Sequence, residues 1–288
     1  MQDGLERVTV CAMTALTLLL ATLMAAESGP SVAPANSAAN PAPETGAVPP
    51  RAAPAPGDLD LLVTRADAAW ALRDQPGQLD ELAAALETAD RLAPNSYAVL
   101  WRQARRFGWL AEEPKLSDTE KSRLGKLAWE AGDRASTLEP GRVEGYFYAM
   151  SGVGNYSLGI GVVSALMKGL EGKFKARLAR AEAIAPGFEA GAIQMSWGRL
   201  YYELPWPKHD AARSEKYLRD AIARNGDNVR AHVYLGDLLL DEGRHEEAKA
   251  AYQRAVAVVV VLGAGDPPEQ LRWQVVAREA IEKLSTKK

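Results

Sequence analysis

The stretch "VRAHVYLGDLLLDEGRHEEAKAAYQRAV", residues 229–256, decides the fold. Gly243 divides it into two apolar-periodic halves, each about the length of an average helix. Small and large side chains share the surfaces expected to face each other: Leu235, Gly236, Ala248, Tyr252 and Ala255. Glycine and alanine let two helices cross closely, while leucine and tyrosine fill the space beside the crossing. The stretch therefore predicts an antiparallel helix pair. Asn228 caps the start of the first helix, and Gly243 forms the turn between the two helices.

The same frame recurs upstream of this pair. Pro94, Pro140 and Pro186 lie 46 residues apart, and each follows an apolar segment. Because proline disfavours helical geometry in the residue before it and cannot continue a helix, each one marks the end of a helix. The frame also places a small residue near each helix end, at intervals of 46, 46, 40 and 34 residues: Ala89, Ala135, Ala181, Ala221 and Ala255.

An interval of 34 residues is the period of the tetratricopeptide repeat, and residues 229–256 resemble that repeat position by position. We therefore predict an all-α domain over residues 59–288. It is a tetratricopeptide-like α-solenoid, a stack of about five antiparallel helix pairs. Asp266 and Pro267 begin a final amphipathic helix, whose apolar face suits a C-terminal cap over the last pair.

The N-terminal part of the chain has a different character. Residues 8–26 are an uncharged apolar run, so we interpret residues 1–26 as a signal peptide or an N-terminal membrane anchor. Residues 27–58 hold 8 of the 17 prolines and have no apolar periodicity, which indicates a disordered linker. We expect export to the periplasm or cell envelope, as a soluble domain after cleavage or as one tethered by an uncleaved helix.

A second resemblance covers residues 143–256. It rests on "AIAPGF" (183–188), "WGRLYYELP" (197–205) and "KYLRDAIA" (216–223), together with the apolar segment that precedes them. These motifs resemble the T component of tripartite ATP-independent periplasmic (TRAP) transporters, a divergent tetratricopeptide family. The resemblance implies a periplasmic helical protein, often membrane-tethered, that associates with a periplasmic substrate-binding protein. It also implies a pore or groove along the helical stack.

The first helix of each pair lines the concave face of such a stack. The frame of residues 229–256 predicts a partner-binding surface of arginines, aromatic residues and polar groups there: Trp101, Arg102, Arg105, Tyr148, Asn155, Arg199, Tyr202, Arg230, Tyr234 and Asp237. Arginine, tyrosine and tryptophan carry much of the binding energy at protein interfaces. A solvated face with each arginine paired to a carboxylate is the alternative.

The segment 145–167 has no charged residue and is rich in glycine. Its glycines recur at a spacing of seven, about two helical turns, so each set lies on one face of a helix. Close approach of a neighbouring helix, an apolar groove for a hydrophobic ligand and a transmembrane helix are the three interpretations. The groove interpretation assigns its wall to four glycines: Gly152, Gly154, Gly159 and Gly161.

Composition excludes several classes of function. A net charge of −3 gives no positive surface potential that would attract nucleic acid. Cys11 is the one cysteine, so no intramolecular disulfide can form. The three histidines have no metal-ligand spacing, and no nucleophile motif is present, so we predict no metal, no cofactor and no enzymatic activity. The predicted function is a cell-envelope scaffold or adaptor that binds a partner protein or peptide on its concave face. The alternative is a TRAP-like accessory protein that binds or passes a hydrophobic ligand through a groove lined by a helix over residues 145–167. In both interpretations, contact with the membrane is assigned to the N-terminal segment alone.

Overall fold

The three predicted helix ends are found two residues before each proline. In the computed structural model, which describes residues 57–286, helices end at Leu92, Leu138 and Ile184. The leader predicted for residues 1–26 lies outside the described residues. So does the predicted linker apart from its last two residues, of which Asp58 begins the first helix.

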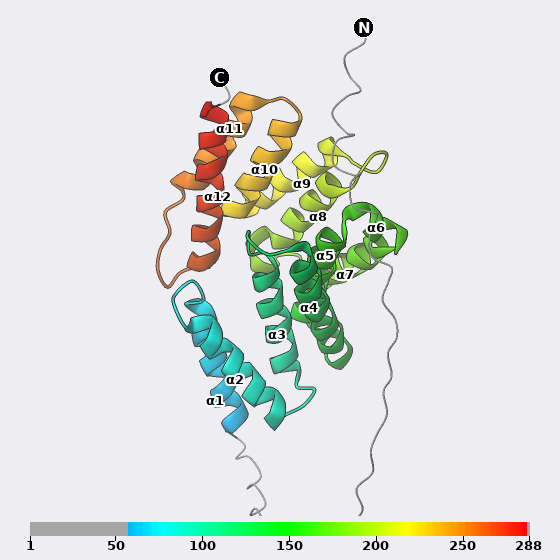
Figure 1. The fold of residues 1–288 in the computed structure, drawn as a ribbon, viewed down its shortest axis with the longest axis vertical. Coiled ribbons are helices and arrows are strands. Elements are labelled where there is room, and N and C mark those ends of the chain that lie inside the picture. Colours follow the sequence, from blue (N-terminus) through cyan, green and yellow to red (C-terminus); the bar gives the residue numbers. More distant parts are fainter. Residues whose placement is uncertain (1–56, 287–288) are drawn as a thin grey trace, which may run out of the picture. The chain divides into compact units, whose positions relative to one another are not determined.

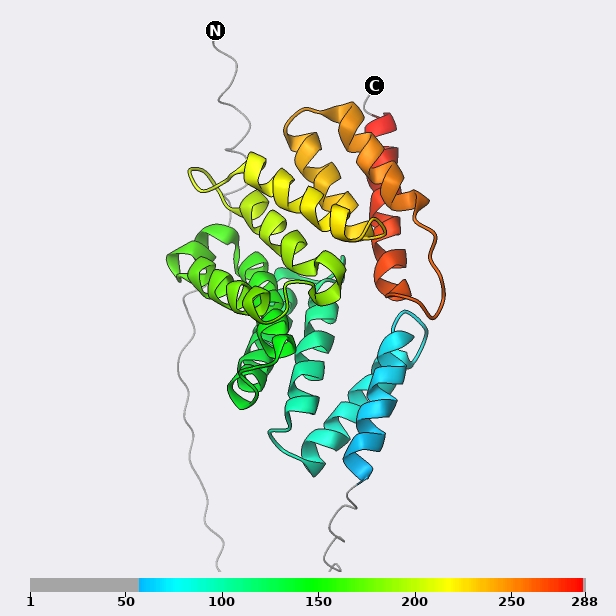
Figure 2. The same cartoon turned by 180° about the vertical axis from the view of Figure 1, so that it is seen from behind.

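The described residues form an all-α solenoid of helical repeats (Figures 1 and 2), and no strand is found among them. The α-helices are α1 (Asp58–Ala71), α2 (Gln78–Leu92), α3 (Tyr97–Ala111), α4 (Asp118–Leu138), α5 (Val143–Ile160), α6 (Val162–Met167), α7 (Leu170–Ile184), α8 (Ala192–Glu203), α9 (Ala211–Arg224), α10 (Val229–Asp241), α11 (His245–Ala257) and α12 (Pro267–Thr286). A short 3-10 helix, η1 (Phe188–Gly191), precedes α8. The antiparallel pairs are α1–α2, α3–α4, α5–α7, α8–α9 and α10–α11, and α12 packs on α10 and α11. The predicted architecture of five pairs and a capping helix is confirmed.

The repeated alanines occupy the points where helices cross. All five are fully buried near the end of the second helix of their pair: Ala89, Ala135, Ala181, Ala221 and Ala255. In the last pair, a side chain at Gly236 would collide with the ring of Tyr252. The small residues of the frame thus set the distance between paired helices, and the tyrosine fills the remaining space.

Both ends of the last pair have the predicted local structure. The Asn228 side chain accepts a hydrogen bond of 3.0 Å from the Ala231 amide, and Gly243 has a φ of 74° at the turn. The Asp266 side chain accepts one of 3.2 Å from the Glu269 amide, which fixes the start of α12. Ala277 of α12 is fully buried in the cluster that includes Tyr252, so the helix covers the end of the stack.

The glycines of α5 pack against the backbone of α4. A Cβ atom at Gly145 would lie 2.6 Å from the Ser136 amide nitrogen, and one at Gly159 would meet Ser122 equally closely. A Cβ at Gly152 would collide with the backbone of Trp129. This geometry matches the neighbouring-helix interpretation of the spacing of seven, and it brings two backbones together along most of α5.

The segment 145–167 is not one helix. Helix α5 ends at Ile160, and Gly161 has a φ of 83°, a left-handed conformation that favours glycine. The chain then turns into the six-residue helix α6. The continuous 145–167 helix that the apolar composition predicted is therefore wrong, because composition alone does not reveal a backbone break at a glycine. Among the described residues, no helix has both the length and the apolar character needed to cross a membrane.

Candidate functional site

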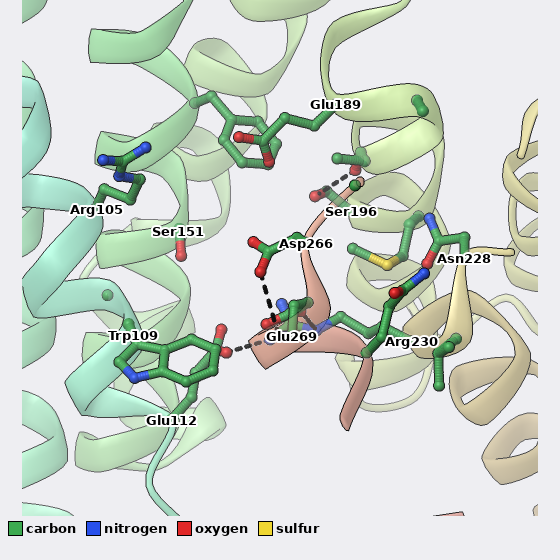
Figure 3. Close-up of a pocket in the computed structure, with 18 of the residues that line it drawn as sticks. Arg105, Trp109, Glu112, Ser151, Glu189, Ser196, Asn228, Arg230, Asp266 and Glu269 are labelled. Atoms are coloured by element: carbon green, nitrogen blue, oxygen red, sulfur yellow. Dashed lines mark hydrogen bonds and ion pairs between the residues drawn. The ribbon is translucent and has the colours of Figure 1, made fainter. Parts of the chain in front are cut away.

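A pocket of about 460 Å³ lies on the inner faces of the stacked helices. The first helices α3, α5, α8 and α10 contribute to its wall, together with the end of α1, η1 and the turn before α12. Figure 3 shows Ser151 and Ser196 on opposite walls, with Asp266 and Glu269 between them. The pocket therefore brings residues of all five helix pairs and the capping helix around one space.

Arg73 holds the start of α12 against the first helix pair. Its side chain is 3% exposed, and its Nη2 donates hydrogen bonds of 2.6 and 2.7 Å to the two carboxylate oxygens of Asp266. The guanidinium also covers the rings of Trp70 and Trp109, at 3.9 and 4.1 Å from their centroids. A buried arginine that binds a carboxylate and covers two aromatic rings therefore ties the end of α1 to the start of α12.

Two more arginines complete this connection. Arg230 of α10 is bound by Glu112, which directly follows α3, and its Nε lies 2.8 Å from Oε1 of Glu269 in α12. Arg272 of α12 covers the Trp109 ring at 3.3 Å and donates a hydrogen bond of 3.1 Å to the Trp109 carbonyl oxygen. We call Arg73, Arg230 and Arg272 with their partners Glu112, Asp266 and Glu269 the clasp. Through it, the last helix contacts the first and second pairs and closes one wall of the pocket.

The clasp also perturbs a carboxyl group. Burial of Glu269, together with the nearby carboxylates Glu112 and Asp266, outweighs the attraction of Arg230 and raises the pKa of Glu269 to about 7. Arg230 is shared between Glu112 and Glu269, so its single positive charge does not compensate both carboxylates.

Glu189 projects into the same pocket from η1. The Tyr148 hydroxyl donates a hydrogen bond of 2.7 Å to its Oε1 atom, and burial among surrounding protein atoms raises the pKa of Glu189. Glu189 and Ala190 have φ values of 44° and 46°, which place two non-glycine residues in left-handed geometry. Such conformations cost about 1–3 kcal/mol each and often occur at functional sites. In the sequence, Glu189 simply follows the Pro186–Gly187 turn, and no motif or spacing marked it as a site residue.

The predicted concave-face residues fall into four groups. Arg105, Tyr148 and Arg230 line the pocket, whereas Trp101 and Arg102 extend the α3 wall, where Arg102 binds Asp67. Four others form a separate cluster on α8 and α10: Arg199, Tyr202, Tyr234 and Asp237. Asn155 is buried behind the wall and donates a hydrogen bond to the Gly108 carbonyl oxygen. The arginines among these residues are paired with carboxylates of the chain: Arg102, Arg105, Arg199 and Arg230.

A smaller cleft of about 110 Å³ lies between α5, α6, α7 and α8. Apolar side chains supply most of its wall, and Gly154 of the predicted groove lines it. Gly161 directly precedes α6 and is not among the lining residues, whereas Gly152 and Gly159 face α4. The structure therefore separates the four candidate groove glycines and leaves one of them at an apolar cleft.

Sequence comparison finds similarity to a repeat family and to a curated export protein. Residues 208–267 match the family model of the tetratricopeptide repeat. The chain is 28% identical to the Vi polysaccharide export protein VexE of Salmonella typhi over 143 residues, which are 49% of this chain. The chain thus spans 20% of the length of that curated relative.

Structure comparison finds a helical repeat fold. A thermophilic TPR protein of Thermus thermophilus has a TM-score of 0.57 at 20% identity, over 77% of this chain and 98% of that one. The flexible tandem repeat domain of a bacterial cellulose synthase has a TM-score of 0.25 at 19% identity, over 81% and 98%. With the first of these likenesses and the tetratricopeptide match in its C-terminal part, the chain is a helical repeat protein. The resemblance to TRAP T components is not confirmed and stays a prediction.

This arrangement has the chemistry of recognition. Helical repeat folds present extended concave surfaces to other macromolecules. Among the described residues, no group of histidine, cysteine, aspartate and glutamate side chains is placed to hold a metal ion. The pocket instead offers carboxylates and hydroxyls next to buried aromatic rings. The helical repeat architecture is consistent with a protein-binding scaffold.

Proposed function

We propose that this protein is a non-enzymatic scaffold of the cell envelope that binds an extended segment of a partner protein in the central pocket. One observation carries the proposal: four successive first helices converge on one pocket of about 460 Å³, large enough for several side chains. Because the clasp fixes the walls of the pocket before binding, little conformational entropy is lost when a segment enters.

The charges of the pocket favour a basic segment. Its arginines Arg73, Arg105 and Arg230 are each held by carboxylates of the chain. Glu189 receives a hydrogen bond from a tyrosine. The lining holds more carboxylates than arginines, so a lysine or arginine of the partner is attracted there.

The aromatic rings support a polypeptide ligand over a stacked sugar. Arg73 and Arg105 cover the Trp70 ring, and Arg73 and Arg272 cover the Trp109 ring. A sugar ring stacks on an open aromatic face. In this pocket, guanidinium groups already cover the faces of both tryptophans. Hydroxyls and carboxylates at the wall suit backbone amides and basic side chains.

An envelope location draws support from two sources. The N-terminal residues have the composition of an export signal or anchor. The curated relative functions, by its name, in polysaccharide export. We propose that the partner belongs to an export or transport assembly of the envelope.

Photo-cross-linking from the pocket tests this function. We expect a benzoylphenylalanine placed at Ser151 or Ser196 to capture the same polypeptide in cells, because both positions face the pocket. Glu189→Gln keeps an oxygen that accepts the hydrogen bond from Tyr148 but removes the carboxylate charge. We expect it to reduce capture about tenfold, the drop in affinity that follows the loss of one charge-assisted hydrogen bond. The matched control is Gly172, exposed on α7 with open space around it. Equal capture from Gly172 contradicts the proposal.

A second function is supported by the apolar cleft at α6. Gly154 lines it, and a side chain there would contact the Phe174 ring at 3.2 Å. A hydrophobic ligand of a TRAP-like accessory protein would occupy this cleft. We expect native mass spectrometry to show an apolar adduct that Gly154→Phe removes, while Gly172→Phe retains it. Retention of the adduct in Gly154→Phe contradicts this second function.

A further inference from the structure

Helix α6 presents an apolar face to solvent. Val163 and Met167 lie four residues apart and therefore on the same face, and Met167 is 86% exposed. Ala165 is buried on the opposite face, in the cluster with Val153 and Leu170, and attaches the helix to the stack. The orientation of α6 is thus set by packing, and Val163 and Met167 are left largely exposed.

The loop between α8 and α9 adds a tryptophan to this face. Trp206 is 88% exposed between Pro205 and Pro207, which restrict the backbone on either side. Lys208 of the loop binds Glu171 at the start of α7, and Leu204 lines the cleft that α6 covers. Figures 1 and 2 both show α6 and this loop on the same side of the stack. We call Leu158, Val163, Met167 and Trp206 the α6 patch.

Basic residues surround the α6 patch. Lys168 directly follows Met167, and Lys173 and Lys208 are exposed on the adjoining segments. The carboxylates of the neighbouring cleft are already bound: Glu171 by Lys175 and Lys208, and Glu203 by Arg199. The patch therefore combines exposed apolar side chains with an excess of positive charge.

A second exposed apolar segment in the chain lacks this charge. Val259, Val261 and Leu262 are exposed between α11 and α12, and Leu262 is 83% exposed. Residues 255–271 contain neither lysine nor arginine. Similar apolar exposure with and without adjoining basic residues gives a matched comparison within one molecule.

We propose that the α6 patch docks on the surface of an anionic lipid bilayer. Tryptophan prefers the interface between headgroups and acyl chains, and methionine and valine insert just below it. Each lysine near an anionic membrane surface adds about fivefold to binding. Docking through this edge orients the solenoid on the membrane, independently of its N-terminal segment and of any ligand in the pocket.

A fluorescent label tests the contact in the full chain. Met167→Cys or Leu262→Cys, each with Cys11→Ser, is labelled with NBD and mixed with vesicles of phosphatidylcholine alone or with about 30% phosphatidylglycerol, an anionic lipid that attracts basic residues. We expect the NBD emission at position 167 to shift to the blue and gain at least about twofold in intensity with anionic vesicles only. With either kind of vesicle, the emission of the label at position 262 should stay the same as in buffer alone. This readout reports the local contact even if residues 1–26 insert into the same vesicles.

The charge requirement has its own variant. Lys168→Glu in the chain labelled at position 167 should raise the lipid concentration for half-maximal response at least about fivefold, since each basic residue contributes that factor. Three outcomes overturn the proposal. The first is an unchanged emission at position 167 on anionic vesicles, and the second is an equal response at positions 167 and 262. The third is a blue shift at position 167 when a protein is added without vesicles, together with no shift on anionic vesicles.

Discussion

Gly152→Leu is expected to destabilise the protein more than any substitution on its outer surface. A Cβ atom at this position would collide with the backbone of Trp129, and backbone has no alternative rotamer. Helices α4 and α5 must separate to admit the side chain, which also weakens the contacts of Gly145 and Gly159 on the same face. We expect a loss of at least about 3 kcal/mol in the free energy of unfolding, measured by urea denaturation.

Gly172→Leu is the matched control, because Gly172 also lies within a helix but has open space around it. It should gain about 0.5–1 kcal/mol, since leucine is the better helix former. If Gly152→Leu does not fold, Gly152→Ala gives the same sign with a smaller loss. Equal stability of Gly152→Ala and the wild type would show that α4 and α5 are not packed backbone to backbone.

The sequence predicted this contact only as one of three alternatives. A spacing of seven shows that Gly145, Gly152 and Gly159 share a face, but a glycine face looks the same towards a helix, a ligand or a lipid. The local signals were more decisive. Proline chemistry located the helix ends, and Asn228 and Gly243 act at the predicted cap and turn.

The pocket was only partly accessible from sequence. Arg105, Tyr148 and Arg230 follow from the repeat frame, because the first helix of each pair faces inward. Arg73, Glu189 and Asp266 do not follow from it, because they lie in connecting segments whose course depends on the whole stack. The pairing of Arg73 with Asp266 joins residues 193 positions apart. No repeat pattern encodes where the last helix meets the first.

That pairing leads to the second large effect, for Arg73→Met. Methionine keeps most of the apolar contact with Trp70 and Trp109 but removes the charge that binds Asp266. Because Arg73 is 3% exposed whereas the Asp266 side chain is 44% exposed, the carboxylate regains water and the loss stays below that of a fully buried pair. We expect the free energy of unfolding to fall by about 2–3 kcal/mol. Exchange of the backbone amides of residues 269–272 should accelerate before global unfolding, because the clasp opens first.

A double-mutant cycle with Asp266→Asn isolates the pair. Asparagine keeps the cap that Asp266 provides to the Glu269 amide, so the remaining effect belongs to the ion pair. We expect a coupling energy of about 1.5 kcal/mol or more between Arg73→Met and Asp266→Asn. Arg65→Met, which breaks the exposed pair with Glu81, should leave stability and exchange unchanged. Additive effects of the two clasp substitutions would mean that the first helix pair and α12 are held together by packing, and that the pocket wall does not depend on charge.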